Sequence, residues 1–101
     1  MGLEHRMNIE IVKRNTKEAN ERLYVSGVDE YYEEIKDQIY ERSLNGFNCL
    51  SFNFPDSGFP FDLEIRIIDQ LVKILLADGF NTTGRKSDEQ TGVRYINISW
   101  A

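Results

Sequence analysis

Three basic residues near the C-terminus are the side chains whose types and spacing could bind a ligand. Arg85 and Lys86 end one strand-like segment, and Arg94 begins another. A polar loop at residues 87–92 separates the two segments, so a β-hairpin would bring the three cations to one end. Guanidinium and ammonium groups bind phosphates and carboxylates. The sequence therefore predicts a binding site for an acidic partner or a small anionic, nucleotide-like ligand. The alternative is that these side chains only protect a sheet edge from pairing.

The residues needed for common catalytic centres are sparse. His5 is the only histidine and Cys49 the only cysteine, so one chain cannot build a Ser-His-Asp triad or a zinc site. No glycine-rich phosphate-binding loop lies between a strand and a helix. Glu30 and Glu34, one helical turn apart, could bind a divalent ion, but such acidic runs are usually solvated helix faces. We expect no enzymatic activity, no metal and no cofactor.

Composition and charge indicate one folded domain. The chain has 101 residues, 41% of them hydrophobic, which is enough for a single core. Its net charge of -5 argues against general nucleic-acid binding, which requires cations on the phosphates. No apolar run approaches the ~18 residues that span a bilayer, and no signal peptide is recognisable. We expect a cytoplasmic protein that does not enter the membrane, with Cys49 buried as a small apolar group in a strand.

The N-terminal region allows two interpretations. Residues 1–7 lack periodicity and are expected to form a flexible leader, followed by a single domain at 8–101. The segment 8–24 suits a short strand by its alternation and a helix by its apolar spacing, and we favour the helix. Asn15 and Glu18 resemble a capping box that would restart the helix within this segment.

Two further helices are predicted at 29–43 and 62–77. Ser26-Gly27 is expected to break the chain before the first of them, and Asp62 to cap the second. Both helices end in the same way, at Asn45-Gly46-Phe47 and Asp78-Gly79-Phe80, because glycine closes a helix in the left-handed conformation and the aromatic packs back.

Alternating polarity predicts three strands. Residues 47–54 have apolar side chains on both faces, which favours a central position. Strand 80–86 and the C-terminal strand form the hairpin, and the C-terminal strand is expected to run antiparallel between the other two. The predicted fold is α+β, a small three-stranded, mostly antiparallel sheet with two to three helices packed on one face.

The helix at 62–77 has more apolar surface than one face of a small core needs. Apolar residues cover roughly 220° of its circumference, whereas a core-facing stripe is only a little over about 100° wide. Either another helix or a second copy of the chain covers the excess. The second possibility predicts a homo-oligomer with Ile65, Val72 and Leu76 in its interface. Among the tyrosines, Tyr32 lies on the apolar stripe of helix 29–43, whereas an exposed Tyr40 would favour partner binding.

The order of helix, Gly-Phe, strand, polar turn and Tyr95-Ile96-Asn97-Ile98-Ser99-Trp100 resembles small tailed-bacteriophage accessory proteins that close on Ile-Ser-Trp. The similarity covers roughly residues 29–100 and carries over no functional residue. It implies a phage-type protein acting in the host bacterial cytoplasm. We expect a non-enzymatic accessory binding protein that blocks a host protein, or sequesters a small anionic ligand, as a homo-oligomer. The alternative is a minor virion structural or assembly protein.

Overall fold

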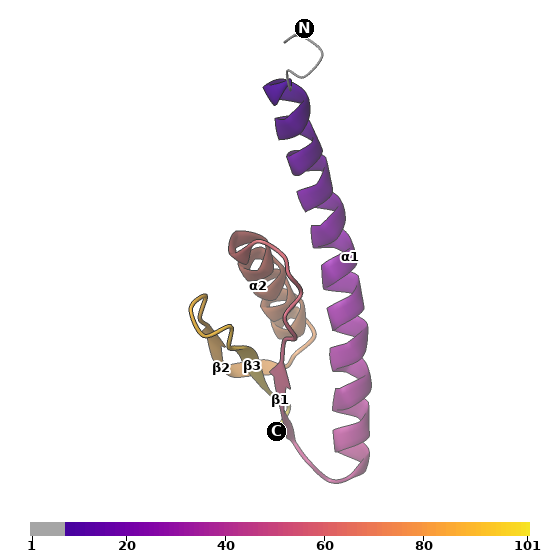
Figure 1. The fold of residues 1–101 in the computed structure, drawn as a ribbon. Helices are drawn as coiled ribbons and strands as arrows, with labels where there is room; N and C mark the ends of the chain where they lie inside the picture. Colours follow the sequence, from indigo (N-terminus) through magenta and orange to yellow (C-terminus); the bar gives the residue numbers. More distant parts are fainter. Residues whose placement is uncertain (1–7) are drawn as a thin grey trace, which may run out of the picture.

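The computed structural model describes residues 8–101 as two helices and a three-stranded antiparallel sheet (Figure 1). In chain order, the elements are α1 (Ile9–Leu44), β1 (Cys49–Asn53), α2 (Phe61–Ala77), β2 (Asn81–Ser87) and β3 (Arg94–Ser99). This is the predicted α+β class, with two helices. The leader predicted at 1–7, which includes His5, lies outside the described residues.

α1 is one uninterrupted helix of 36 residues, where two helices were predicted. It begins after Asn8, whose side-chain Oδ1 accepts a hydrogen bond from the backbone N–H of Glu10 at 3.0 Å. The helix preference for segment 8–24 is confirmed. The restart at Asn15 and the break at Ser26-Gly27 are wrong.

Gly27 lies in the middle of α1 because α2 packs closely against the helix there. The residue is buried, and a Cβ built on it would lie 2.7 Å from Cδ1 of Ile67. Glycine inside a helix costs about 0.5–1 kcal/mol relative to alanine. Because glycine has no side chain, Ile67 of α2 can pack against α1 at this point. A residue that predicts a helix break from the sequence therefore forms a helix–helix contact in the fold.

Both helices end as the sequence predicts. Gly46 has a φ of 85°, its N–H donates to the Ser43 carbonyl at 3.1 Å, and the N–H of Phe47 donates to the Arg42 carbonyl at 3.0 Å. The same pair of bonds closes α2 around Gly79. This double closure is the Schellman motif, which satisfies carbonyl groups that the helix leaves unpaired.

The start of α2 differs from the prediction. Asp62 makes no capping hydrogen bond and lies in the first turn, because Pro60 occupies the cap position with φ -55° and ψ 142°. The Pro60 carbonyl accepts the first helical bond, from the N–H of Glu64 at 3.1 Å. Asp62 still favours the helix through the positive end of its dipole.

The sheet has the order β1-β3-β2, so the C-terminal strand lies in the middle as predicted. The prediction of a central strand at 47–54 is wrong, since β1 is an edge strand. Cys49, expected to be buried, is exposed, because it faces away from the helices while Leu50 and Phe52 face the core. Its carbonyl accepts a hydrogen bond from Arg42 Nε at 2.7 Å, which covers one polar group of this edge.

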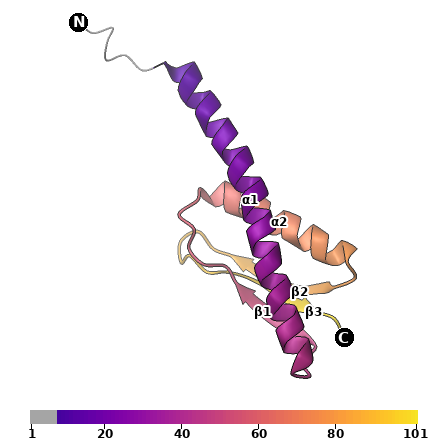
Figure 2. The same cartoon turned by 90° about the vertical axis from the view of Figure 1, so that its right-hand side faces the viewer.

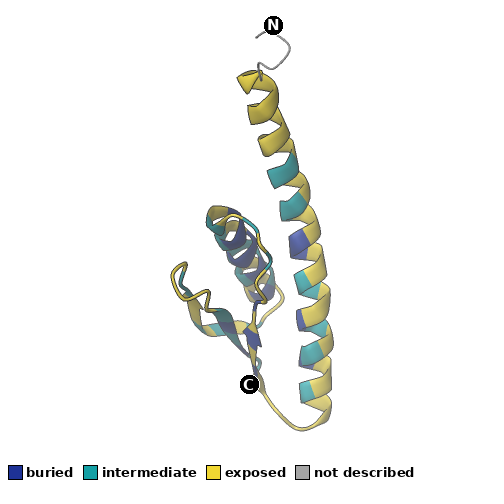
Figure 3. Ribbon diagram, viewed as in Figure 1, coloured by how far each residue is buried: buried dark blue, intermediate teal, exposed yellow. Residues whose placement is uncertain are grey.

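The two helices pack on the same face of the sheet, and α1 crosses in front of both α2 and the sheet (Figure 2). Buried residues form a stripe along the side of α1 that faces α2, and along α2 itself (Figure 3). Of the two covers foreseen for the broad apolar surface of α2, the structure shows the first, a neighbouring helix. The core contains Val28, Ile35, Ile39, Leu50, Phe52, Phe54, Leu63, Ile67, Ile68, Leu71, Leu75, Ile96 and Ile98.

Candidate functional site

The structure does not bring the three predicted cations together. Arg94 points into the molecule, where its Nε forms an ion pair with Oε2 of Glu64, and the two side chains are 10% and 7% exposed. Arg85 pairs with Asp69 of α2 at 2.5 Å. Lys86 lies opposite Tyr95 of β3 and is exposed. Two of the three charges are therefore compensated by carboxylates, and anion binding by this set stays a prediction without support from the geometry.

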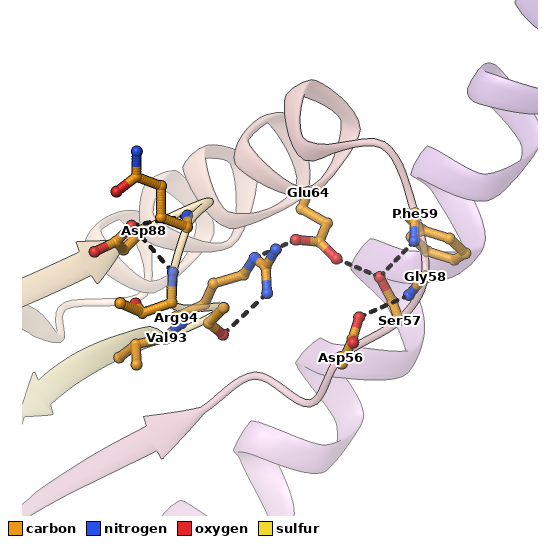
Figure 4. A network of polar contacts seen from close by, with 11 residues as sticks. Asp56, Ser57, Gly58, Phe59, Glu64, Asp88, Val93 and Arg94 are labelled. Atoms are coloured by element: carbon orange, nitrogen blue, oxygen red, sulfur yellow. Dashed lines mark hydrogen bonds and ion pairs between the residues drawn. The ribbon is translucent and has the colours of Figure 1, made fainter.

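The Arg94 and Glu64 pair is the centre of a polar network that joins two loops to α2 (Figure 4). Ser57 Oγ donates to Glu64 Oε1 at 2.5 Å and accepts from the N–H of Phe59 at 3.1 Å. Nη1 of Arg94 donates to the carbonyl of Gly92 at 3.0 Å. Buried charges need such partners to offset their desolvation. The network explains Arg94 as a structural residue of the hairpin loop.

The predicted oligomer interface lies on one side of α2. Ile65, Val72 and Leu76 follow one another at spacings of seven and four residues, and Asp69 lies on the same side between them. Asp69, on this side of α2, forms an ion pair with Arg85 of β2. Ile65 and Val72 are half-buried, while Leu76 is 50% exposed. The interface itself stays a prediction, with Leu76 as its most accessible member.

The first turns of α1 form a projecting arm, which we define as residues 9–22. In Figures 1 and 3 this part of α1 rises beyond α2 and the sheet, and every residue from 9 to 18 is exposed. Arg66 of α2 marks where the arm leaves the domain. Its Nη1 bonds Glu21 Oε1 at 2.9 Å, and its guanidinium lies 3.9 Å from the ring centroid of Tyr24. The Arg66 guanidinium holds the pKa of the Glu21 carboxyl below its usual range.

A groove of about 390 Å³ lies between the C-terminal halves of the two helices. We call it the tyrosine groove. α1 contributes two tyrosines, a lysine and a core isoleucine to its wall, and the end of α2 with the residues after it contributes the rest. The lining residues are Tyr32, Lys36, Ile39, Tyr40, Leu75, Asp78 and Phe80.

Two polar contacts define the rim of the tyrosine groove. The Tyr32 hydroxyl donates to Asp78 Oδ2 at 3.0 Å, and this bond raises the pKa of Tyr32 above its usual value. Nζ of Lys36 lies 3.0 Å from Oε2 of Glu33 on the same helix, and this contact raises the pKa of Lys36. The lysine charge therefore has a local partner.

Sequence reasoning missed the tyrosine groove although it singled out several of its residues. The sequence predicts that Tyr32 packs on the apolar stripe of its helix and that an exposed Tyr40 would contact a partner. The aromatic at position 80 was identified only as part of a helix stop. Nothing in their spacing shows that Tyr40 and Phe80, forty residues apart, line the same groove. That proximity is decided by how α1 crosses α2.

The described residues contain no candidate for a metal site or for a membrane-crossing helix. Across residues 8–101, no three His, Cys, Asp or Glu side chains are grouped to hold a metal ion. Neither α1 nor α2 combines the length and apolar character of a membrane-crossing helix. Comparisons with protein-family models, curated proteins and solved structures each returned no match.

Proposed function

We propose that the protein is a non-enzymatic binding protein that acts as a homo-oligomer, in which two copies associate through their arms. The observation that carries this proposal is the apolar surface of the arm. Ile9 is 64% exposed, Ile11 48% and Val12 47%. Helices in water are stabilised mainly by packing an apolar face, so exposed aliphatic side chains on a helix that has left its domain favour a partner.

The spacing of the arm residues favours another helix as that partner. Along one side of the arm, a set of residues recurs at alternating intervals of three and four. This is the spacing of the residues that form the contact seam of a coiled coil. The members are mostly small or aliphatic, so two backbones could approach closely. They are Ile9, Val12, Thr16 and Ala19. The next position in this spacing, Leu23, packs against the core of its own domain.

The charge distribution along α1 favours a second copy in the antiparallel orientation. The arm carries four basic and three acidic residues, close to balance, whereas residues 29–43 carry six acidic residues against two basic ones. A parallel pair would place two acidic segments side by side, which like-charge repulsion disfavours. An antiparallel pair keeps these segments at opposite ends of the dimer.

In this proposal, binding is the activity. The dimer would present two domains, each with an open sheet face and a tyrosine groove, to a partner macromolecule. The phage resemblance of the C-terminal pattern adds the expectation that the partner is a host protein in the bacterial cytoplasm. A dimer with two identical binding surfaces binds with higher avidity to a partner that carries two or more copies of the recognised surface.

Two adjacent arm residues give a matched test by sedimentation velocity. Val12 lies on the proposed seam and Ile11 does not, and their exposed fractions are nearly equal, 47% and 48%. We expect the wild-type chain and Ile11→Glu to sediment as dimers at high concentration, and Val12→Glu as a monomer. Both variants should keep the wild-type circular dichroism spectrum because neither residue belongs to the core. A wild-type chain that is monomeric at every concentration would overturn the proposal, as would equal dissociation by both substitutions.

A further inference from the structure

The tyrosine groove combines aromatic walls with an apolar floor. Tyr32 and Tyr40 lie two helical turns apart on α1, and Phe80 approaches from the start of the hairpin. Ile39 and Leu75 belong to the buried core and close the groove below. The volume of about 390 Å³ falls in the range of small-molecule pockets. The shape therefore suits a small ligand with an apolar body.

The electrostatic surroundings of the groove favour a cation. Asp78 lines it with a carboxylate, and this residue is the C-cap of α2, where the helix dipole is negative. Asp37, the residue after Lys36 on α1, places a further exposed carboxylate near the groove. Aromatic faces attract cations through their quadrupole.

Lys36 is the one basic residue that lines the groove, and its charge has a partner. Its ammonium lies 3.0 Å from the carboxylate of Glu33. The two charges compensate each other, which leaves the Asp78 carboxylate as the net charge at the rim. Tyr32 donates only a neutral hydroxyl to that carboxylate.

We propose that the tyrosine groove binds a small organic cation, an alkylammonium or quaternary ammonium group with a short apolar body. The cation lies against the rings of Tyr40 and Phe80 and close to the Asp78 carboxylate. Aromatic side chains with a nearby carboxylate recognise such groups in water, because a quaternary ammonium is only weakly hydrated and gains from both contacts. This site is independent of the arm, so it is unaffected by whether the chain is a dimer.

Choline and its neutral isostere 3,3-dimethylbutan-1-ol separate charge recognition from apolar contact. We expect choline to shift the backbone amide NMR signals of residues 32–40 and 75–80 saturably, and the neutral alcohol to bind at least about tenfold more weakly. The fluorescence of Trp100 gives a second readout, since its ring packs edge-to-face on Phe80 with centroids 6.2 Å apart.

Three variants and one control assign the contacts. Tyr40→Ala removes a ring that is 64% exposed, and Asp78→Asn removes the charge while keeping an oxygen for the Tyr32 hydroxyl. Each should weaken choline binding by about tenfold. Lys36→Gln should strengthen it. Asp29→Asn makes the same charge change on α1 outside the groove and should leave binding unchanged.

Several outcomes would overturn the proposal. Equal affinity for choline and its isostere would show an apolar groove without charge selection. Unchanged choline affinity in both Tyr40→Ala and Asp78→Asn would place binding elsewhere. Tighter binding of inorganic phosphate than of choline, lost in Lys36→Gln, would identify an anion site, and no saturable shift with choline would remove the site altogether.

Discussion

At the scale of single residues, Gly27 predicts a helix break in the sequence but forms a helix–helix contact in the fold. Glycine lowers helix propensity by about 1 kcal/mol, and next to a serine it predicts a break. In the fold it is the point where Cδ1 of Ile67 approaches α1. The helix continues because the packing gained at this contact outweighs the local cost of glycine.

A double-mutant cycle tests this role of Gly27. Gly27→Ala should destabilise the protein, because overpacking costs about 1–3 kcal/mol and helix propensity offsets only about 1 kcal/mol of it. In an Ile67→Val background the Cδ1 atom is gone, and the other contacts of the added Cβ, at 3.5 and 3.9 Å, are ordinary. There, Gly27→Ala should stabilise by up to about 1 kcal/mol. Urea unfolding measures both steps, and the same sign in both backgrounds would contradict the steric explanation.

The buried pair of Glu64 and Arg94 gives a second prediction at this scale. Replacing only Glu64 by Gln, or only Arg94 by Met, leaves one charge buried without its counter-ion and should cost about 3–5 kcal/mol of unfolding free energy. Replacing both, as Glu64→Leu with Arg94→Met, should cost much less than the two single changes together. Additive losses in thermal unfolding would mean that the two side chains do not depend on each other.

At the scale of elements, α2 is the central structural helix. It contacts α1 on one side and the sheet on another, and its broad apolar surface is explained by these two neighbours. Most of the apolar circumference identified in the sequence is thus used inside the chain. Little apolar surface of α2 is therefore left for association, and the arm of α1 offers more.

Two leucines of α2 separate its buried and exposed sides. Leu71 is fully buried, with 0% exposure, whereas Leu76 is 50% exposed. Leu71→Ala should destabilise the chain by about 2–5 kcal/mol, and Leu76→Ala should change stability by no more than about 0.5 kcal/mol. Chemical denaturation gives both values. If Leu76→Glu dissociates the dimer in sedimentation while Val12→Glu does not, the interface predicted on α2 replaces the one proposed on the arm.

At the scale of the whole molecule, the chain is elongated. The radius of gyration of its Cα atoms is 17.8 Å, and its longest extent is 69 Å. A compact domain of this length has a radius of gyration of about 13 Å. The difference arises because α1 continues past the domain and leaves its first turns without neighbours (Figure 1).

Small-angle X-ray scattering of the Val12→Glu variant tests this shape without interference from association. We expect a radius of gyration near the 17.8 Å of the Cα trace. A value close to ~13 Å would show that the arm folds back onto the domain. In that case the exposed arm could not mediate dimerisation as proposed.

The sequence alone determined the features that depend on neighbouring residues. The α+β class, both helix ends and the hairpin follow from apolar periodicity and from glycines with positive φ, which are local properties. Tertiary structure decided the features that depend on distant residues. These are the continuation of α1 through Gly27, the edge position of β1, the ion pair of Arg94 with Glu64 and the meeting of Tyr40 with Phe80. The physical reason is that each of these depends on which surface packs against which, and the free energy of that packing exceeds the local preference of a few residues.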